Sequence, residues 1–115
     1  MIENPHDVVT ELAAIRAQSE RGLTILRETE QKLVAAVMAA ERAEASAFLD
    51  AQGTVADRQA VAKIKALPAR EAAELAKVEV NYVKAKLKSL SESMMAVQTS
   101  ARMIELQWKT AGIER

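Results

Sequence analysis

The chain contains no cysteine, and its 115 residues include only three glycines, two prolines and three aromatic residues. The lack of cysteine excludes a disulfide framework and a thiolate metal site, and it fits an intracellular protein. The scarcity of the other residue types argues against a β-sandwich or β-barrel, because those folds need frequent turns and β-branched or aromatic core residues. Disorder is also disfavoured, since half of the residues are hydrophobic and the net charge is zero. Alanine-rich helices remain.

Two further features are missing from the sequence. The first seven residues carry acidic side chains and no apolar core, so they do not have the form of a secretory signal peptide. No apolar run approaches the roughly 18–20 residues that a membrane-spanning helix needs. We therefore expect a cytoplasmic protein that does not contact a membrane.

The first half of the chain predicts one long helix over about residues 5–51. Asn4 followed by Pro5 is a helix-start signal, because Asn accepts hydrogen bonds from free amides of the first turn and Pro loses no needed donor there. Gly22 is the only glycine in this segment and indicates a bend or a close helix crossing. Apolar or small residues recur, at steps close to three and four, at Leu12, Ile15, Ser19, Leu23, Leu26, Leu33, Val37, Ala40 and Ala47.

Residues 51–68 predict a break and then a short connector helix. Gly53 can take the left-handed conformation beyond a helix C-terminus, and Thr54 can cap the next helix. We expect the connector helix over about residues 55–66, because Pro68 disfavours helical geometry in the residue before it. Pro68 could instead lie in the first turn of the next helix or kink a continuous one.

The strongest pattern predicts a second long helix over about residues 69–111. Its apolar residues alternate at steps of four and three over about six heptads, which is typical of a coiled coil. We call these positions the second-helix seam: Ala69, Ala73, Ala76, Val80, Val83, Leu87, Leu90, Met94, Val97, Ala101, Ile104, Trp108 and Ala111. Further apolar residues flank the seam at Leu75, Val78, Tyr82, Met103 and Leu106. Gly112 would end this helix.

These elements predict an all-α fold: a single elongated domain over residues 1–115, built as a long antiparallel helical hairpin or coiled coil. A two-helix hairpin buries only one strip on each helix, which is little for a chain of this size. We therefore expect copies of the chain to assemble into a helical bundle. The predicted oligomer interface consists of Ala76, Val80, Val83, Leu87, Leu90, Met94, Val97, Ala101, Ile104 and Trp108. A groove for a partner's helix is the alternative.

The zero net charge conceals two halves of opposite sign. Residues 1–50 contain nine acids and five bases, net −4, and residues 51–115 contain seven acids and eleven bases, net +4. One interpretation is that the basic half pairs with the acidic helix, within or between chains. The other is a basic surface that follows a phosphate backbone, although only Tyr82 is available nearby to stack on bases. The candidate partner or nucleic-acid contacts are Lys63, Lys65, Arg70, Lys77, Lys84 and Lys88.

Known catalytic patterns are absent from the sequence. It contains no H-E-x-x-H, no glycine-rich phosphate loop, no G-x-S-x-G and no pair of Glu-x-x-His motifs such as di-iron helical bundles use. Glu30 and Glu44 lie on or beside the apolar positions of the first helix, where buried carboxylates usually pair with Lys or Arg. We therefore expect no enzyme activity, no catalytic residue, no cofactor and no metal site.

Residues 77–99 combine a tyrosine and spaced lysines with Leu87-x-x-Leu90 and then a stretch containing Ser and Gln. This segment resembles part of a group of small helical proteins encoded by tailed phages. Those proteins are generally of unassigned activity and tend to be encoded beside recombination or replication genes. The resemblance covers about a third of the chain and implies a context, host cytoplasm and DNA recombination, rather than any site residue.

The sequence therefore predicts a non-enzymatic, homo-oligomeric helical protein, phage-encoded, that acts through protein–protein contacts near recombination or replication machinery. Two alternatives remain open. One is a direct nucleic-acid-binding protein that uses the basic residues between 58 and 88. The other is an inhibitor or structural protein that docks on a host or virion partner.

Overall fold

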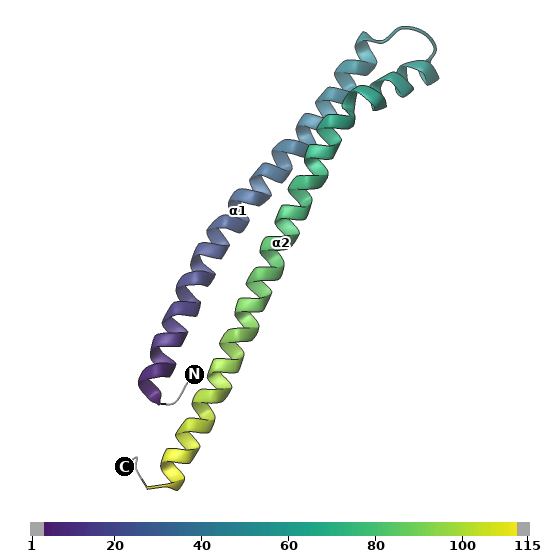
Figure 1. The fold of residues 1–115 in the computed structure, drawn as a ribbon. Coiled ribbons are helices and arrows are strands. Elements are labelled where there is room, and N and C mark those ends of the chain that lie inside the picture. Colours follow the sequence, from purple (N-terminus) through teal and green to yellow (C-terminus); the bar gives the residue numbers. More distant parts are fainter. Residues whose placement is uncertain (1–3, 113–115) are drawn as a thin grey trace. The chain divides into compact units, whose positions relative to one another are not determined.

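A computed structural model describes residues 4–112, and this part of the chain consists of two α-helices without strands (Figure 1). Helix α1 spans Pro5–Asp50 and helix α2 spans Val55–Thr110. The four residues between them reverse the direction of the chain, so the two helices pair antiparallel. The predicted all-α helical hairpin is confirmed.

The helix ends follow from local sequence signals. The backbone N–H of Asp7 donates to Asn4 Oδ1 at 3.1 Å, and the N–H of Asp57 donates to Thr54 Oγ1 at 3.2 Å. Each cap oxygen thus satisfies one of the amides that a first helical turn leaves without a partner. Gly53 and Gly112 both have positive φ, +112° and +71°, which glycine adopts without steric cost. The predicted caps and stops are therefore confirmed.

The region around Pro68 differs from the expected connector helix followed by a separate helix. Helix α2 is continuous from Val55 to Thr110, with Pro68 inside it. Proline lacks the N–H that would bond to the carbonyl of Ile64, and such interruptions commonly bend helices. In Figure 1 the first turns of α2 run at an angle to the turns that follow. The kinked continuous helix is the correct alternative, because flanking helix formers extend the helix through a proline.

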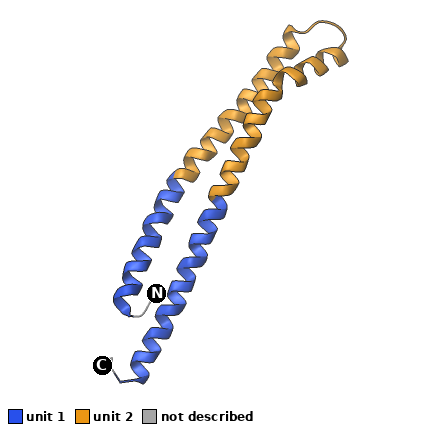
Figure 2. Cartoon of the chain, viewed as in Figure 1, with its two compact units in different colours: residues 1–24, 84–115 blue, residues 25–83 orange. Residues whose placement is uncertain are grey.

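The chain divides into two compact units, each made of one segment from either helix (Figure 2). Unit 1 contains residues 1–24 and 84–115, and unit 2 contains residues 25–83. In unit 1 the core consists of Val8 and Ile15 from α1 and Val97 and Ile104 from α2, with further partly buried residues packed against them. Those further residues are Leu12, Leu90, Met94, Ala101 and Trp108.

Unit 2 is held together by small side chains. Its most completely buried residues are Ala62 and Ala66 of α2, at 1% and 0% exposure, while α1 contributes Ala40 and Ala47. Small residues let two helix backbones approach closely, but each buries little apolar area. Among residues 4–112 no large side chain is fully buried. Both units therefore have thin cores, and much apolar surface stays outside them.

Helix α1 buries a regular set of positions, and the sequence pattern predicts only some of them. The buried and half-buried positions alternate at steps of four and three at Val8, Leu12, Ile15, Ser19, Gly22, Leu26, Thr29, Leu33, Ala36, Ala40, Ala43 and Ala47. The predicted members Leu23 and Val37 are exposed, at 59% and 41%, and their neighbours Gly22 and Ala36 take those places. Thr29 occupies a buried position of this set, and its hydroxyl donates to the carbonyl of Leu26 at 2.9 Å, so the buried polar group has a partner.

Candidate interaction surfaces

The second-helix seam packs inside the chain. In unit 1 its residues from Leu90 to Trp108 contact Val8, Leu12 and Ile15 of α1. In unit 2, Val80 and Val83 are buried and Ala76 is half-buried. The residues predicted to form an oligomer interface thus have an intramolecular partner, because a hairpin uses the same heptad pattern that an assembly of separate helices would use. Whether these residues also contact a second copy stays a prediction.

Gly22 shows how closely the two helices of unit 1 pack. A Cβ atom built at Gly22 would lie 2.6 Å from Leu87 Cδ2. The glycine therefore leaves room for the Leu87 side chain against α1, in the manner of a knob that enters a hole. The expected close helix crossing at Gly22 is confirmed.

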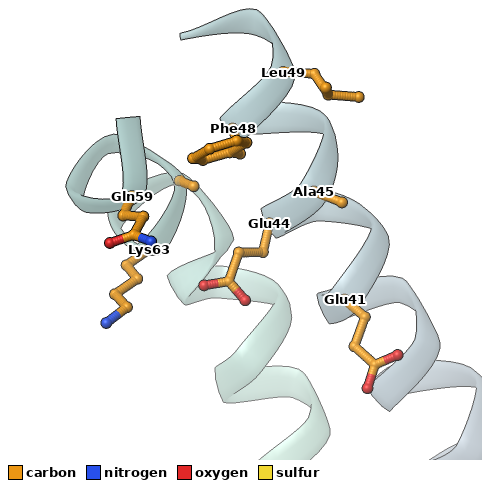
Figure 3. A pocket seen from close by; sticks show the side chains of 8 residues that line it. Glu41, Glu44, Ala45, Phe48, Leu49, Gln59 and Lys63 are labelled. Atoms are coloured by element: carbon orange, nitrogen blue, oxygen red, sulfur yellow. The ribbon is translucent and has the colours of Figure 1, made fainter. Parts of the chain in front are cut away.

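A hollow that contains charged groups lies in unit 2, where α1 ends and α2 begins. It has a volume of about 550 Å³ and is lined by Glu41, Glu44, Ala45, Phe48, Leu49, Gln59, Ala62 and Lys63. Figure 3 shows Phe48 and Leu49 at one end and the carboxylates of Glu41 and Glu44 along the side. The hollow is open, and its polar groups are two carboxylates, an amide and one ammonium. These groups can receive a partner's side chains.

Arg58 fixes the junction beside this hollow. Its guanidinium lies over the Phe48 ring, 4.4 Å from the ring centroid. Its Nε–H also donates to the carbonyl of Phe48 at 3.2 Å. One side chain therefore stacks on an aromatic ring and satisfies a carbonyl in the last turn of α1, which has no helical donor of its own. No sequence pattern predicts this contact, because it depends on the conformation of residues 51–54.

All six basic candidates are exposed on α2: Lys63, Lys65, Arg70, Lys77, Lys84 and Lys88. In unit 2, Lys63, Arg70 and Lys77 recur every seven residues, so they form one row along the edge of the helix. Arg70 Nη2 pairs with Glu44 Oε1 of α1 at 2.6 Å. Both side chains are partly exposed, at 45% and 34%, so solvent screens this pair and its contribution to stability is small.

The two glutamates singled out from the sequence differ in their surroundings. Glu44 is half-buried and forms the ion pair with Arg70. Glu30 is exposed, so the expectation of a buried carboxylate there is wrong. Thr29, rather than Glu30, occupies the buried position of that heptad, because a hydroxyl that bonds its own helix can be buried at less cost than a carboxylate.

The outer side of α2 in unit 2 carries three large exposed apolar residues, which we call the outer stripe: Leu75, Val78 and Tyr82. Their side chains are 71%, 64% and 63% exposed. They follow each other at steps of three and four, so they share one face of the helix, away from the seam that packs on α1. A shallow hollow of about 480 Å³ adjoins this face and is lined by Leu67, Arg70, Glu71, Glu74, Leu75 and Val78.

Unit 1 contains a further apolar hollow, of about 430 Å³. Its lining residues are Pro5, Val8, Val9, Ala101, Ile104, Glu105 and Trp108. Trp108 is half-buried there as part of the core between the helices. The arrangement is apolar, and the one charged lining residue, Glu105, pairs with Lys109 at 3.0 Å.

Within residues 4–112, no group of three or more His, Cys, Asp or Glu side chains is placed to hold a metal ion. Over the same range, neither helix has an apolar stretch that would cross a lipid bilayer.

Comparison of the chain with protein-family models, with curated proteins and with solved structures found no match. The surfaces described above therefore carry the functional argument.

Proposed function

We propose that the protein is a non-enzymatic, homo-oligomeric helical protein that acts through protein–protein contacts. The observation that carries this proposal is the outer stripe, three large apolar side chains that are each more than 60% exposed on one helix face. Exposed apolar side chains that lie together on one face usually form a contact site for another protein. The intramolecular seam leaves this face free.

The thin cores support the same proposal. A hairpin in which alanine and single valine or isoleucine residues form most of the core buries little apolar area for its length. Association with a second copy or with another helix adds the missing burial, as in bundles built from hairpins. Further copies of the chain are present wherever the chain itself is present, so a second copy is the simplest partner.

The resemblance of residues 77–99 to small phage helical proteins supports a partner in DNA recombination or replication. That segment includes Tyr82 of the outer stripe and the exposed lysines that follow it. A partner of this class would contact the outer stripe with an apolar helix face.

The test is affinity capture from phage-infected host cells with three versions of the chain. We expect the unchanged chain to retain a specific protein that a Leu75→Glu, Val78→Glu variant does not retain. A control variant with the same added charge, Gln98→Glu, Gln107→Glu, changes exposed residues outside the outer stripe and should retain the protein. Equal retention by all three chains, or a purified chain that turns over a small substrate, contradicts the proposal.

A direct nucleic-acid-binding function is the second candidate, and the row of Lys63, Arg70 and Lys77 favours it. Its members are about 10.5 Å apart along the helix, at 1.5 Å per residue. This function predicts DNA binding that weakens steeply with salt and is lost when Lys63, Arg70 and Lys77 are replaced by Glu. Binding that is unchanged by these replacements contradicts it.

A further inference from the structure

The outer stripe lies wholly within unit 2, and the charges beside it are of one sign. Glu71, Glu74 and Glu79 flank the stripe on α2, and all three are exposed. At about 100° per residue, each of them lies within roughly 75° of the centre of the stripe around the helix axis. Lys77, the one base between Glu71 and Tyr82, lies roughly 130° away from that centre. Over this stretch the stripe is therefore an apolar surface edged by acids alone.

Within residues 4–112, none of these three glutamates forms an ion pair. The residues three and four positions from Glu71 and from Glu79 on the same helix include no base, so neither carboxylate has a partner within α2. Glu74 has Arg70 and Lys77 at such positions, but the Arg70 guanidinium pairs instead with a glutamate of α1 and Lys77 forms no ion pair. The charges of all three carboxylates are thus available to a partner.

The shallow hollow beside the stripe combines apolar and acidic side chains. Its apolar lining comes from Leu67, Leu75 and Val78, and its free carboxylates come from Glu71 and Glu74, while its one base is already paired with α1. A lysine or arginine side chain lays its methylene stem along apolar surface while its charged end reaches a carboxylate. Because the hollow offers both features side by side, it suits a basic side chain of a partner.

We propose that the outer stripe binds a basic amphipathic helix of a partner protein. This inference rests on the proposed function, in which a partner's helix contacts this surface, and it names the chemistry of that helix. The partner's apolar side chains pack on Leu75, Val78 and Tyr82, and lysines or arginines on either side of them pair with the three glutamates. The stripe is about 11 Å long from Leu75 to Tyr82, so apolar residues at steps of three and four over about two turns of the partner match it.

The same charges disfavour other occupants of the stripe. A second copy that packs on this face brings its own acids against Glu71, Glu74 and Glu79, whereas a basic helix brings the opposite charge. The contact between two copies at this surface is therefore weaker than the contact with a basic helix, and the helix displaces a second copy. Nucleic acids and anionic membranes carry the same sign of charge as this surface, which repels them.

Fluorescence anisotropy with two synthetic peptides tests the chemistry of the occupant. The basic peptide is a helix of about 18 residues with leucines at steps of three and four and lysines on either side of them. The acidic peptide has glutamate at every lysine position. We expect the natural chain to bind the basic peptide at least about tenfold more tightly than the acidic one, and this difference to shrink as salt is added. Equal binding of the two peptides, or binding of neither, overturns the inference.

Two charge variants locate the binding surface. The first removes the acids beside the stripe: Glu71→Gln, Glu74→Gln, Glu79→Gln. The control removes three exposed acids of α1 in the same unit: Glu28→Gln, Glu30→Gln, Glu41→Gln. Both variants lose three negative charges, so they differ only in where the charge is lost. We expect the first to bind the basic peptide at least about tenfold more weakly than the natural chain, and the control to stay within about twofold. Equal losses in the two variants contradict the proposed site.

The apolar half of the contact is tested without a change of charge by Leu75→Asn, Val78→Asn. We expect this variant to bind the basic peptide at least about tenfold more weakly. Its helix content should match that of the natural chain, because both side chains are exposed and do not pack on α1. Unchanged affinity would show that the acids attract the peptide without a docking surface, which is contrary to the inference.

Sedimentation of the natural chain with saturating basic peptide separates this inference from the proposed self-association. We expect a complex of one chain with one peptide. A dimer that keeps its two chains while it binds the peptide overturns the inference and leaves self-association standing. A chain that is a monomer on its own, yet binds the peptide through the three glutamates, contradicts self-association and leaves the inference standing.

Discussion

At the scale of single residues, Gly22 determines how near Leu87 lies to α1. A methyl group at position 22 would lie 2.6 Å from Leu87 Cδ2, so the leucine side chain would have to move. Alanine, however, favours a helix over glycine by about 1 kcal/mol. The two effects have opposite signs, and their balance depends on whether Leu87 is present.

We predict that Gly22→Ala depends on its neighbour. In the natural chain the substitution should change the free energy of unfolding by less than about 1 kcal/mol, because a shift of Leu87 offsets the gain in helix propensity. In a Leu87→Ala background the same substitution should stabilise by about 1 kcal/mol. Urea unfolding of the four proteins gives the coupling, and an identical effect of Gly22→Ala in both backgrounds contradicts this account of the contact.

Arg58 is the residue whose loss should most affect the junction of the helices. Arg58→Ala removes the contact with the Phe48 ring and the hydrogen bond to the Phe48 carbonyl. We expect this substitution to lower the free energy of unfolding by about 1–2 kcal/mol. The neighbouring exposed residue offers a control, since Gln59→Ala should change stability by less than about 0.5 kcal/mol. Equal unfolding midpoints for both variants would show that the Arg58 contacts contribute nothing.

At the scale of elements, Pro68 decides the form of α2. Proline inside a helix costs about 3 kcal/mol relative to alanine, partly offset by the smaller entropy of the unfolded chain. Because Pro68 lies within a continuous helix, we expect Pro68→Ala to raise the free energy of unfolding by about 1–2 kcal/mol. Circular dichroism measures the helix content of the variant, and urea unfolding measures its free energy of unfolding. Destabilisation by Pro68→Ala would indicate instead that residues 66–69 form a turn between two helices.

The two helices also differ in how much of them the sequence predicts. The α2 seam is predicted at every position from Ala69 to Trp108, because each position carries an apolar residue and the steps of four and three continue without interruption. In α1 the buried positions include Gly22, Thr29 and Ala36, while the larger Leu23 lies exposed next to Gly22. A prediction that assigns the buried position to the larger apolar residue is therefore wrong at Gly22, since the close approach of the two helix backbones favours the smaller residue there.

The interaction surfaces are predictable to different extents. The outer stripe and the exposed lysines can be read from spacing, because a long helix converts sequence distance directly into position on a face. The ion pair of Arg70 with Glu44 requires the register of one helix against the other, which the loop of residues 51–54 sets. The stacking of Arg58 on Phe48 requires the backbone path of that same loop.

At the scale of the whole molecule, the question is what covers the apolar surface that neither unit buries. The exposed large apolar residues of the described chain lie on both helices, and the outer stripe is among the most exposed of them. Protein cores that bury this little are usually supplemented by oligomerisation when neither disulfide bonds nor a metal ion is present. We therefore expect the chain to self-associate through α2.

Sedimentation equilibrium across micromolar concentrations measures this self-association. We expect a mass of at least twice the 12.5 kDa of one chain, decreasing towards one chain on dilution. We also expect Leu75→Glu, Val78→Glu to give the mass of one chain with unchanged helicity, because those side chains do not contribute to the intramolecular seam. A mass of 12.5 kDa for the natural chain at every concentration would contradict the account.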